Sequence, residues 1–204
     1  MAITVSSTSS QKAAVSWWTW ANVLTGLRFV VCVPLFVCLA GAWWWTALVL
    51  LLIAAVSDWL DGWLARYTKT VTALGRNLDP LADKVLVCGS LIFLLAHVNS
   101  GVAPWMVAVI TIRELLITSL RGVVEQAGMP FGAALFGKLK MVLQMVALLA
   151  IVGYLAMASS APPWFTPIRG GLEWTRDGLV YATVLVTVLS GLQYLVRARA
   201  VLPH

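Results

Sequence analysis

Four of the five aspartates in this 204-residue chain, Asp58, Asp61, Asp79 and Asp83, fall within one stretch of 26 residues. The first pair is spaced by three residues and the second by four, so each pair shares one face of a helix. Crowded carboxylates repel one another unless a cation binds among them, and their oxygen atoms favour Mg²⁺, Mn²⁺ or Ca²⁺ over Zn²⁺. The spacing predicts a divalent-metal site, in which two ions about 4 Å apart could clamp a phosphoryl group during transfer.

Other residues around these aspartates suit a phosphate ligand. Gly62 and Gly75 have no side chain, so a ligand can approach the backbone there. Arg66 can bind a phosphate through two parallel hydrogen bonds. An isolated Asp-x-x-Asp-Gly is more typical of a helix cap or turn, so the prediction depends on the whole set of spaced positions.

The elements that carry these residues must be membrane helices. Hydrophobic residues make up 61% of the chain and charged residues 11%, which is too apolar for a soluble domain. Apolar runs approach the ~20 residues that cross a bilayer, and none alternates like a barrel strand. We therefore expect an all-α fold with about six transmembrane helices, at Asn22–Leu39, Trp43–Ala65, Asp79–His97, Val102–Leu120, Lys138–Met157 and Leu179–Val196.

The distribution of basic residues predicts the orientation. One side of the predicted bundle has only Arg169 and Arg176. The other side has Lys12, Arg66, Lys69, Arg76, Lys138, Lys140, Arg197 and Arg199. Lys and Arg accumulate in cytoplasmic loops, so both termini and the aspartates should be cytoplasmic. The net charge of +6 then reflects topology and attraction to anionic lipid, and it is no argument for nucleic acid.

The remaining segments give less information about fold and function. Residues 1–16 are rich in Ser and Thr and predict a disordered tail ahead of one membrane domain at 17–204. Residues Ala13 to Ala21 suit an interfacial helix or an extension of the first span. Cys32, Cys38 and Cys88 lack metal-ligand spacing and are expected in the core. The short chain has no transit-like segment, which favours a bacterial plasma membrane over an organelle.

The full pattern Asp-x2-Asp-Gly-x2-Ala-Arg-x8-Gly-x3-Asp-x3-Asp resembles the signature of the CDP-alcohol phosphatidyltransferases, and every position from Asp58 to Asp83 matches. The resemblance covers nearly all of residues 20–200. It implies six membrane helices around a cytoplasm-facing polar cavity, bound divalent cations, a homodimer, and transfer of a phosphatidyl group from a CDP-linked lipid to an alcohol with loss of CMP.

The resemblance also implies roles for individual residues. Asp58, Asp61, Asp79 and Asp83 would bind two Mg²⁺ or Mn²⁺ ions, and Asp83 would also be the general base. A carboxylate within hydrogen-bond reach of the alcohol can accept its proton, although Asp83 could instead be a metal ligand alone. The CDP pocket would comprise Asp61, Gly62, Ala65, Arg66, Gly75 and Asp79, and also Asn22, Thr25 and Arg28 from a shorter motif that could be a plain helix start.

A second polar set indicates the acceptor alcohol. Arg113 and Glu114 lie deep in an apolar span, where charged residues need a polar cavity or partners. Arg113, Arg121, Lys138 and Lys140 suit a second phosphate, although cations near helix ends are often only interfacial anchors. This set resembles the family members that use sn-glycerol 3-phosphate, which implies CDP-diacylglycerol as the donor. Inositol phosphate, phosphatidylglycerol and serine are alternative acceptors, with serine the least suited to so many cations.

A divalent-cation transporter is an alternative from another class. Transport would place polar groups near the bilayer midplane with access from both sides. The charged residues here lie mostly towards one side, so this alternative is disfavoured.

Overall fold

The computed structural model describes residues 20–68, 73–126 and 135–201, and this part of the chain contains helices and no strand. The α-helices are α1 (Trp20–Ala40), α2 (Trp44–Thr68), α3 (Ala73–Leu94), α4 (Pro104–Gln126), α5 (Leu135–Ser160) and α6 (Phe165–Val201), with a 3₁₀-helix, η1 (Val98–Ser100), before α4. The predicted all-α class is confirmed. The tail predicted at 1–16 lies outside the described residues, as does all but Trp20 and Ala21 of the predicted interfacial helix.

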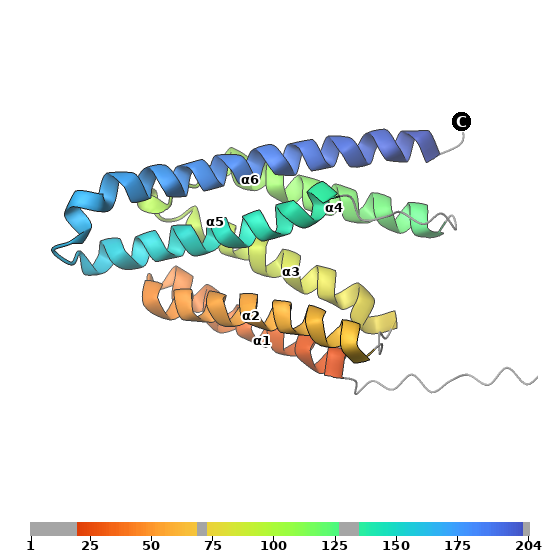
Figure 1. The fold of residues 1–204 in the computed structure, drawn as a ribbon, viewed down its shortest axis with the longest axis horizontal. Helices are drawn as coiled ribbons and strands as arrows, with labels where there is room; N and C mark the ends of the chain where they lie inside the picture. The colour runs from red at the N-terminus through yellow and green to blue at the C-terminus, as the bar shows by residue number, and fades with distance from the viewer. Residues whose placement is uncertain (1–19, 69–72, 127–134, 202–204) are drawn as a thin grey trace, which may run out of the picture.

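The helices run up and down along one axis (Figure 1). Helix α1 packs against α2 and α3, α5 packs against α6 and α2, and α4 packs against α6. Helices α1, α3 and α5 begin at the same end of the bundle at which α2, α4 and α6 end (Figure 1). We call this end the site end, because it carries all four clustered aspartates.

A tight turn joins α1 to α2 at the opposite end of the bundle. The Trp43 amide donates to the Cys38 carbonyl at 2.8 Å, and the Ala42 amide donates to the Leu39 carbonyl at 3.3 Å. This pair of bonds is a Schellman motif, which satisfies the last carbonyls of a helix. The motif requires a left-handed residue, and Ala42 has φ 56°. The chain thereby reverses within three residues and returns α2 towards the site end.

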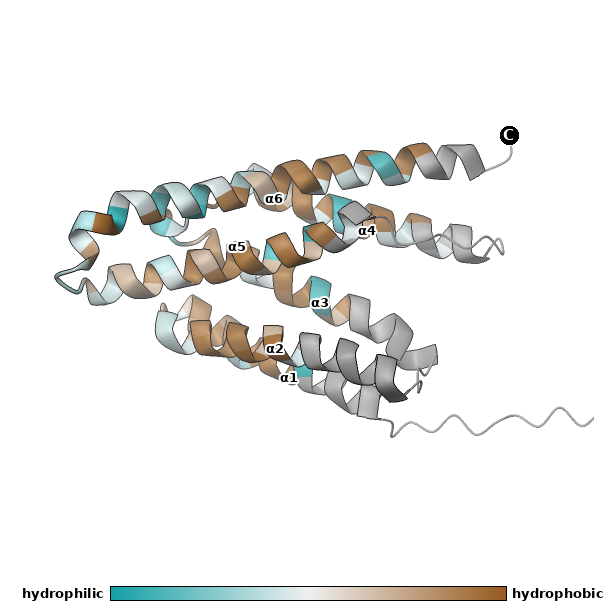
Figure 2. Cartoon of the chain, viewed as in Figure 1, coloured by the Kyte–Doolittle hydropathy of each residue, from teal (hydrophilic) through white to brown (hydrophobic). Residues whose placement is uncertain are grey.

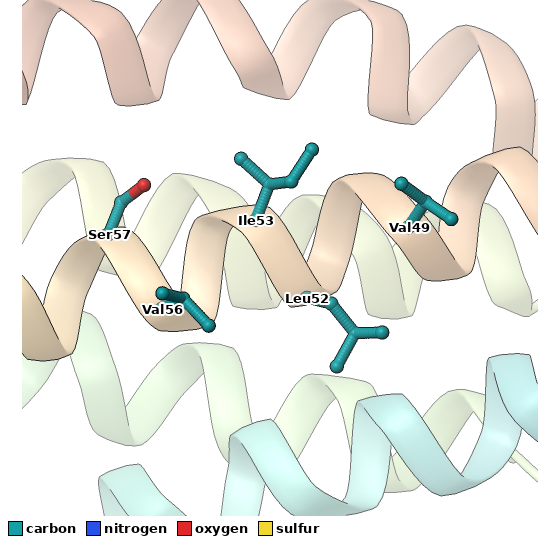
Figure 3. Close-up of a pocket in the computed structure, with 5 residues that line it drawn as sticks. All are labelled: Val49, Leu52, Ile53, Val56 and Ser57. Atoms are coloured by element: carbon teal, nitrogen blue, oxygen red, sulfur yellow. The ribbon is translucent and has the colours of Figure 1, made fainter.

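The core and the outer surface are both apolar. On α2, Ala47, Leu51 and Ala54 are buried against the neighbouring helices. The opposite face of α2 is exposed and lines a hollow formed by Val49, Leu52, Ile53, Val56 and Ser57 (Figure 3). Large exposed apolar faces are rare on soluble monomers, which supports a membrane environment. Figure 2 shows hydrophobic residues along the middle of α1, α2 and α5, and hydrophilic residues in the first turns of α6.

Two segments of the described chain are long and apolar enough to cross a membrane. They are Leu139–Ser160 in α5 and Phe165–Val196 in α6. Shorter apolar stretches occur at Arg28–Ala40 in α1 and Trp44–Ser57 in α2. The structure thus confirms a helical protein with long apolar helices, while the number of crossings stays a prediction.

Two helices begin at least six residues earlier than the sequence predicted. Helix α3 begins at Ala73 rather than Asp79, and α6 begins at Phe165 rather than Leu179. Hydropathy marks where a helix becomes apolar, whereas the backbone becomes helical up to several turns before that point. The first turns of α6 are held by polar contacts: the Tyr154 hydroxyl donates to Glu173 at 2.5 Å, and Arg169 donates to the same carboxylate at 2.9 Å.

Gly89 is required for the close approach of α1 and α3. A Cβ atom at this position would clash with the ring of Phe36, which stacks on Phe93 with ring centroids 5.2 Å apart. Gly153 on α5 is also in the middle of a helix but has open space around it. The two glycines form a matched pair, because both would gain helix propensity on replacement by alanine.

We predict that Gly89→Ala lowers the free energy of unfolding by about 1–3 kcal/mol through overpacking. Gly153→Ala should leave it unchanged or raise it by up to ~1 kcal/mol. Thermal unfolding in detergent micelles measures both effects. Equal behaviour of the two variants would mean that Phe36 moves aside without cost.

Candidate active site at the site end

The predicted site residues lie on five helices that meet at the site end. Asp58, Asp61, Gly62, Ala65 and Arg66 belong to α2, Gly75, Asp79 and Asp83 to α3, and Asn22, Thr25 and Arg28 to α1. Arg113 and Arg121 belong to α4, and Lys138 and Lys140 to α5. The structure describes the side chains of Arg28, Asp83, Arg113 and Lys140, and those of the other predicted residues lie outside the described part.

Arg28 and Asp83 form an ion pair between α1 and α3. Arg28 Nη1 donates to Asp83 Oδ1 at 2.7 Å, and the Arg28 side chain is 4% exposed. This charge-assisted bond orients the Asp83 carboxylate and ties α1 to α3. Sequence reasoning assigned these residues to different parts of the site, and the structure brings them into direct contact.

Glu114 is the centre of a buried polar cluster between α4 and α5. Its Oε1 accepts a hydrogen bond from Lys140 Nζ, and Arg113 Nη1 and Gln144 Nε2 each approach it to 3.5 Å. Glu114, Lys140 and Gln144 are all buried. A buried carboxylate is tolerated only when it is paired and hydrogen-bonded, and these three donors meet that condition.

Arg113 lies between Glu114 and α6. Its guanidinium carbon is 5.7 Å from the centre of the Tyr194 ring, at a distance typical of a cation–π contact. Gly191 makes room for it, since a Cβ there would be 3.2 Å from Arg113 Cγ. Arg113 Nε is buried without a hydrogen-bond partner in the described part of the chain. This nitrogen is enclosed beside Gly191 on α6 and is not exposed to solvent.

Lys84 links α3 to α4. Its Nζ donates to Thr118 Oγ1, and the Thr118 hydroxyl donates to the Glu114 carbonyl at 2.6 Å. Sequence reasoning gave no role to Lys84, Thr118 or Tyr194. The available signals were the position of Lys84 directly after Asp83 and the i, i+4 spacing of Glu114 and Thr118, which places them on one helix face.

The described side chains alone do not make a metal site. Among them, no three His, Cys, Asp or Glu residues gather closely enough to hold an ion. The side chains of Asp58, Asp61 and Asp79 lie outside the described part of the chain. The donor set is nevertheless made of carboxylate oxygens, which fit Mg²⁺ or Mn²⁺. The predicted ligand set stays a prediction.

Comparison with known proteins identifies the class. A family model described as CDP-alcohol phosphatidyltransferase matches residues 18–189. This chain belongs to the CDP-alcohol phosphatidyltransferase family. The match spans α1 to α5 and most of α6, and so includes every predicted site residue. The family predicted from the aspartate pattern is confirmed.

Two curated relatives carry a name more specific than that of the family. The chain is similar to the CDP-diacylglycerol–glycerol-3-phosphate 3-phosphatidyltransferase of Escherichia coli (strain K12), with 34% identity over 185 residues, 88% of this chain and 94% of the relative. It is 44% identical over 115 residues to the protein of that name in Bacillus subtilis (strain 168), which covers 56% of this chain and 55% of that relative.

We predict that Glu114→Ala destabilises the protein by about 3–5 kcal/mol, because it leaves Lys140 and Arg113 as buried cations without their carboxylate. Arg169→Ala is the control: its partner Glu173 is also a carboxylate, but the Arg169 side chain is 54% exposed and solvent screens the pair. Thermal unfolding in detergent measures both variants. Similar losses of stability in the two variants would contradict the prediction, because they would show that burial does not make the Glu114 ion pairs more important than an exposed pair.

Proposed function

We propose that this chain transfers the phosphatidyl group from CDP-diacylglycerol to sn-glycerol 3-phosphate, which yields phosphatidylglycerophosphate and CMP. The observation that carries the proposal is the buried cationic cluster around Glu114, on the helices next to the one that carries Asp83. Guanidinium and ammonium donors beside the reacting centre suit an acceptor that bears its own phosphate. The names of the Escherichia coli and Bacillus subtilis relatives agree with this acceptor.

The proposed chemistry is an in-line displacement at the lipid-linked phosphorus. The acceptor hydroxyl oxygen forms a new bond to that phosphorus, and the bond from the phosphorus to the oxygen of the CMP phosphate breaks. Asp83 accepts the hydroxyl proton, while Arg28 holds the other side of the carboxylate in place. Divalent cations held by Asp58, Asp61, Asp79 and Asp83 would neutralise charge on the pyrophosphate oxygens.

The remaining residues of the proposed site bind and orient the two substrates. Arg113, which already contacts the Glu114 carboxylate, would donate to the acceptor phosphate. Lys140 is engaged by Glu114, so it contributes mainly by setting the charge and rigidity of this region. Arg121 and Lys138 complete the proposed acceptor set. The proposed CDP pocket comprises Asn22, Thr25, Arg28, Asp61, Gly62, Ala65, Arg66, Gly75 and Asp79.

The proposal includes a setting in the membrane. Six helices would cross a plasma membrane. A polar cavity and both termini would lie on the cytoplasmic side. The protein would act as a homodimer, and it would bind two Mg²⁺ or Mn²⁺ ions. Support comes from the apolar outer faces of α1, α2, α5 and α6, and from the excess of Lys and Arg predicted at the site end. Residues 17–204 would form one membrane domain.

The acceptor is tested by a panel of alcohols in one CMP-release assay. Purified protein with CDP-diacylglycerol and Mg²⁺ should release CMP with sn-glycerol 3-phosphate and should do so far more slowly with inositol phosphate, phosphatidylglycerol or serine. The lipid product is identified by mass spectrometry. Faster turnover with another acceptor would overturn the acceptor assignment and leave the family assignment intact.

Asp83→Asn should lower kcat by roughly 100-fold or more, because a general base contributes about 10²–10⁴ to the rate. CDP-diacylglycerol binding, measured by calorimetry, should persist. Asp177→Asn is the matched control: this fifth aspartate pairs with Arg176 beside η1, at the opposite end of the bundle, and its loss should leave kcat unchanged. Appreciable activity in the Asp83→Asn variant would show that Asp83 is not the general base.

A further inference from the structure

The Lys84 side chain lies between the two halves of the proposed site. Lys84 directly follows Asp83 on α3, and successive residues of a helix point about 100° apart. Asp83 contacts Arg28 on α1, and Lys84 contacts Thr118 on α4. One turn of α3 therefore directs the proposed base to one side and an ammonium group to the other, towards Arg113 and Glu114.

The charge of Lys84 is not matched by a direct ion pair. Lys140 and Arg113 both contact the Glu114 carboxylate, and Arg28 contacts the Asp83 carboxylate. The described partner of Lys84 is the neutral Thr118 hydroxyl, and no described carboxylate lies within ion-pair distance of its ammonium. A partly buried cation without a carboxylate is costly, and an anionic ligand would relieve that cost.

We propose that Lys84 binds the phosphate of the acceptor and thereby places the acceptor hydroxyl beside Asp83. This inference rests on the proposed function and adds a residue that the aspartate pattern and the cationic set did not include. The ligand class is a small phosphomonoester that carries a free hydroxyl. Lys84 and Arg113 hold the phosphate from α3 and α4, and Asp83 on the same turn of α3 receives the proton.

A purely structural role of Lys84 would lead to a different experimental result. If Lys84 serves only to tie α3 to α4, removal of either partner of the Lys84–Thr118 hydrogen bond should have the same effect. If Lys84 binds the phosphate, its charge matters and the Thr118 hydroxyl matters little. Lys84→Met removes the ammonium and keeps a flexible side chain, and Thr118→Val removes the hydroxyl at nearly constant volume.

The experiment measures acceptor kinetics in these variants and in Lys84→Arg, which restores a cation. Lys84→Met should raise the KM for sn-glycerol 3-phosphate at least ~10-fold, because it removes a charge-assisted hydrogen bond. The KM for CDP-diacylglycerol should change less than ~2-fold, in keeping with a loss confined to one substrate. Thr118→Val should raise the acceptor KM by less than ~3-fold, as expected for the loss of a neutral hydrogen bond. Lys84→Arg should recover part of the loss.

A second measurement reports phosphate binding without chemistry. n-Propyl phosphate bears the phosphate but no attacking hydroxyl, so it should compete with sn-glycerol 3-phosphate as a dead-end inhibitor. Its inhibition constant should rise in Lys84→Met in parallel with the acceptor KM. Thermal unfolding of each variant in detergent shows that it is folded.

Three outcomes would overturn the inference. They are an unchanged inhibition constant in Lys84→Met, an equal effect of Lys84→Met and Thr118→Val on the acceptor KM, and a rise in the KM for CDP-diacylglycerol instead. Failure of the proposed function is distinguishable, because it would appear first in the unaltered protein as an absence of turnover with sn-glycerol 3-phosphate.

Discussion

The structure depends on the high cost of charge inside an apolar bundle. Glu114 is buried between α4 and α5, and it is stable there because Lys140, Arg113 and Gln144 all direct donors at one oxygen. The same constraint applies to Arg28, which pairs with Asp83 across α1 and α3. The bonds from Lys140, Gln144 and Arg28 run between helices, so the energetic requirement for pairing also fixes which helices meet at the site end.

Helix α3 is the element that joins the two groups of charges. It packs against α1 through Gly89 and Phe36, and this close approach lets Asp83 reach Arg28. It also contacts α4, where the Lys84–Thr118 bond lies. Thr118 is itself bonded to the Glu114 backbone. Through the neighbouring residues Asp83 and Lys84, these polar contacts thus lead from α1 through α3 to α4 and α5.

Sequence reasoning recovered much of this arrangement. The aspartate pattern identified the family, hydropathy predicted six helices, and the family resemblance assigned Arg28, Asp83, Arg113 and Lys140 to one site. It did not recover the pairing of Lys140 with Glu114 or the contact of Lys84 with Thr118. Helical periodicity determines which face of its own helix a residue occupies, but the opposing helix depends on the packing of the whole bundle. For the same reason Lys140 was assigned to a phosphate and Glu114 to no particular partner.

The two ends of the bundle use charge differently, and this difference explains why the site end alone suggests a substrate site. At the opposite end, Arg176 is buried but fully occupied: it contacts its neighbour Asp177, donates to the Asn99 carbonyl at 2.6 Å, and lies 4.5 Å from the centre of the Tyr154 ring. These partners join α6 to η1 and α5, and Gly101, with φ 73°, admits the Arg176 side chain close to the backbone. Every charge there is matched by a local structural contact. At the site end, Lys84 has only a neutral described partner and Arg113 retains a buried donor without one, so the positive charge exceeds what the described contacts require. A cation without a described carboxylate partner is costly in an apolar bundle, and an anionic substrate would lower that cost.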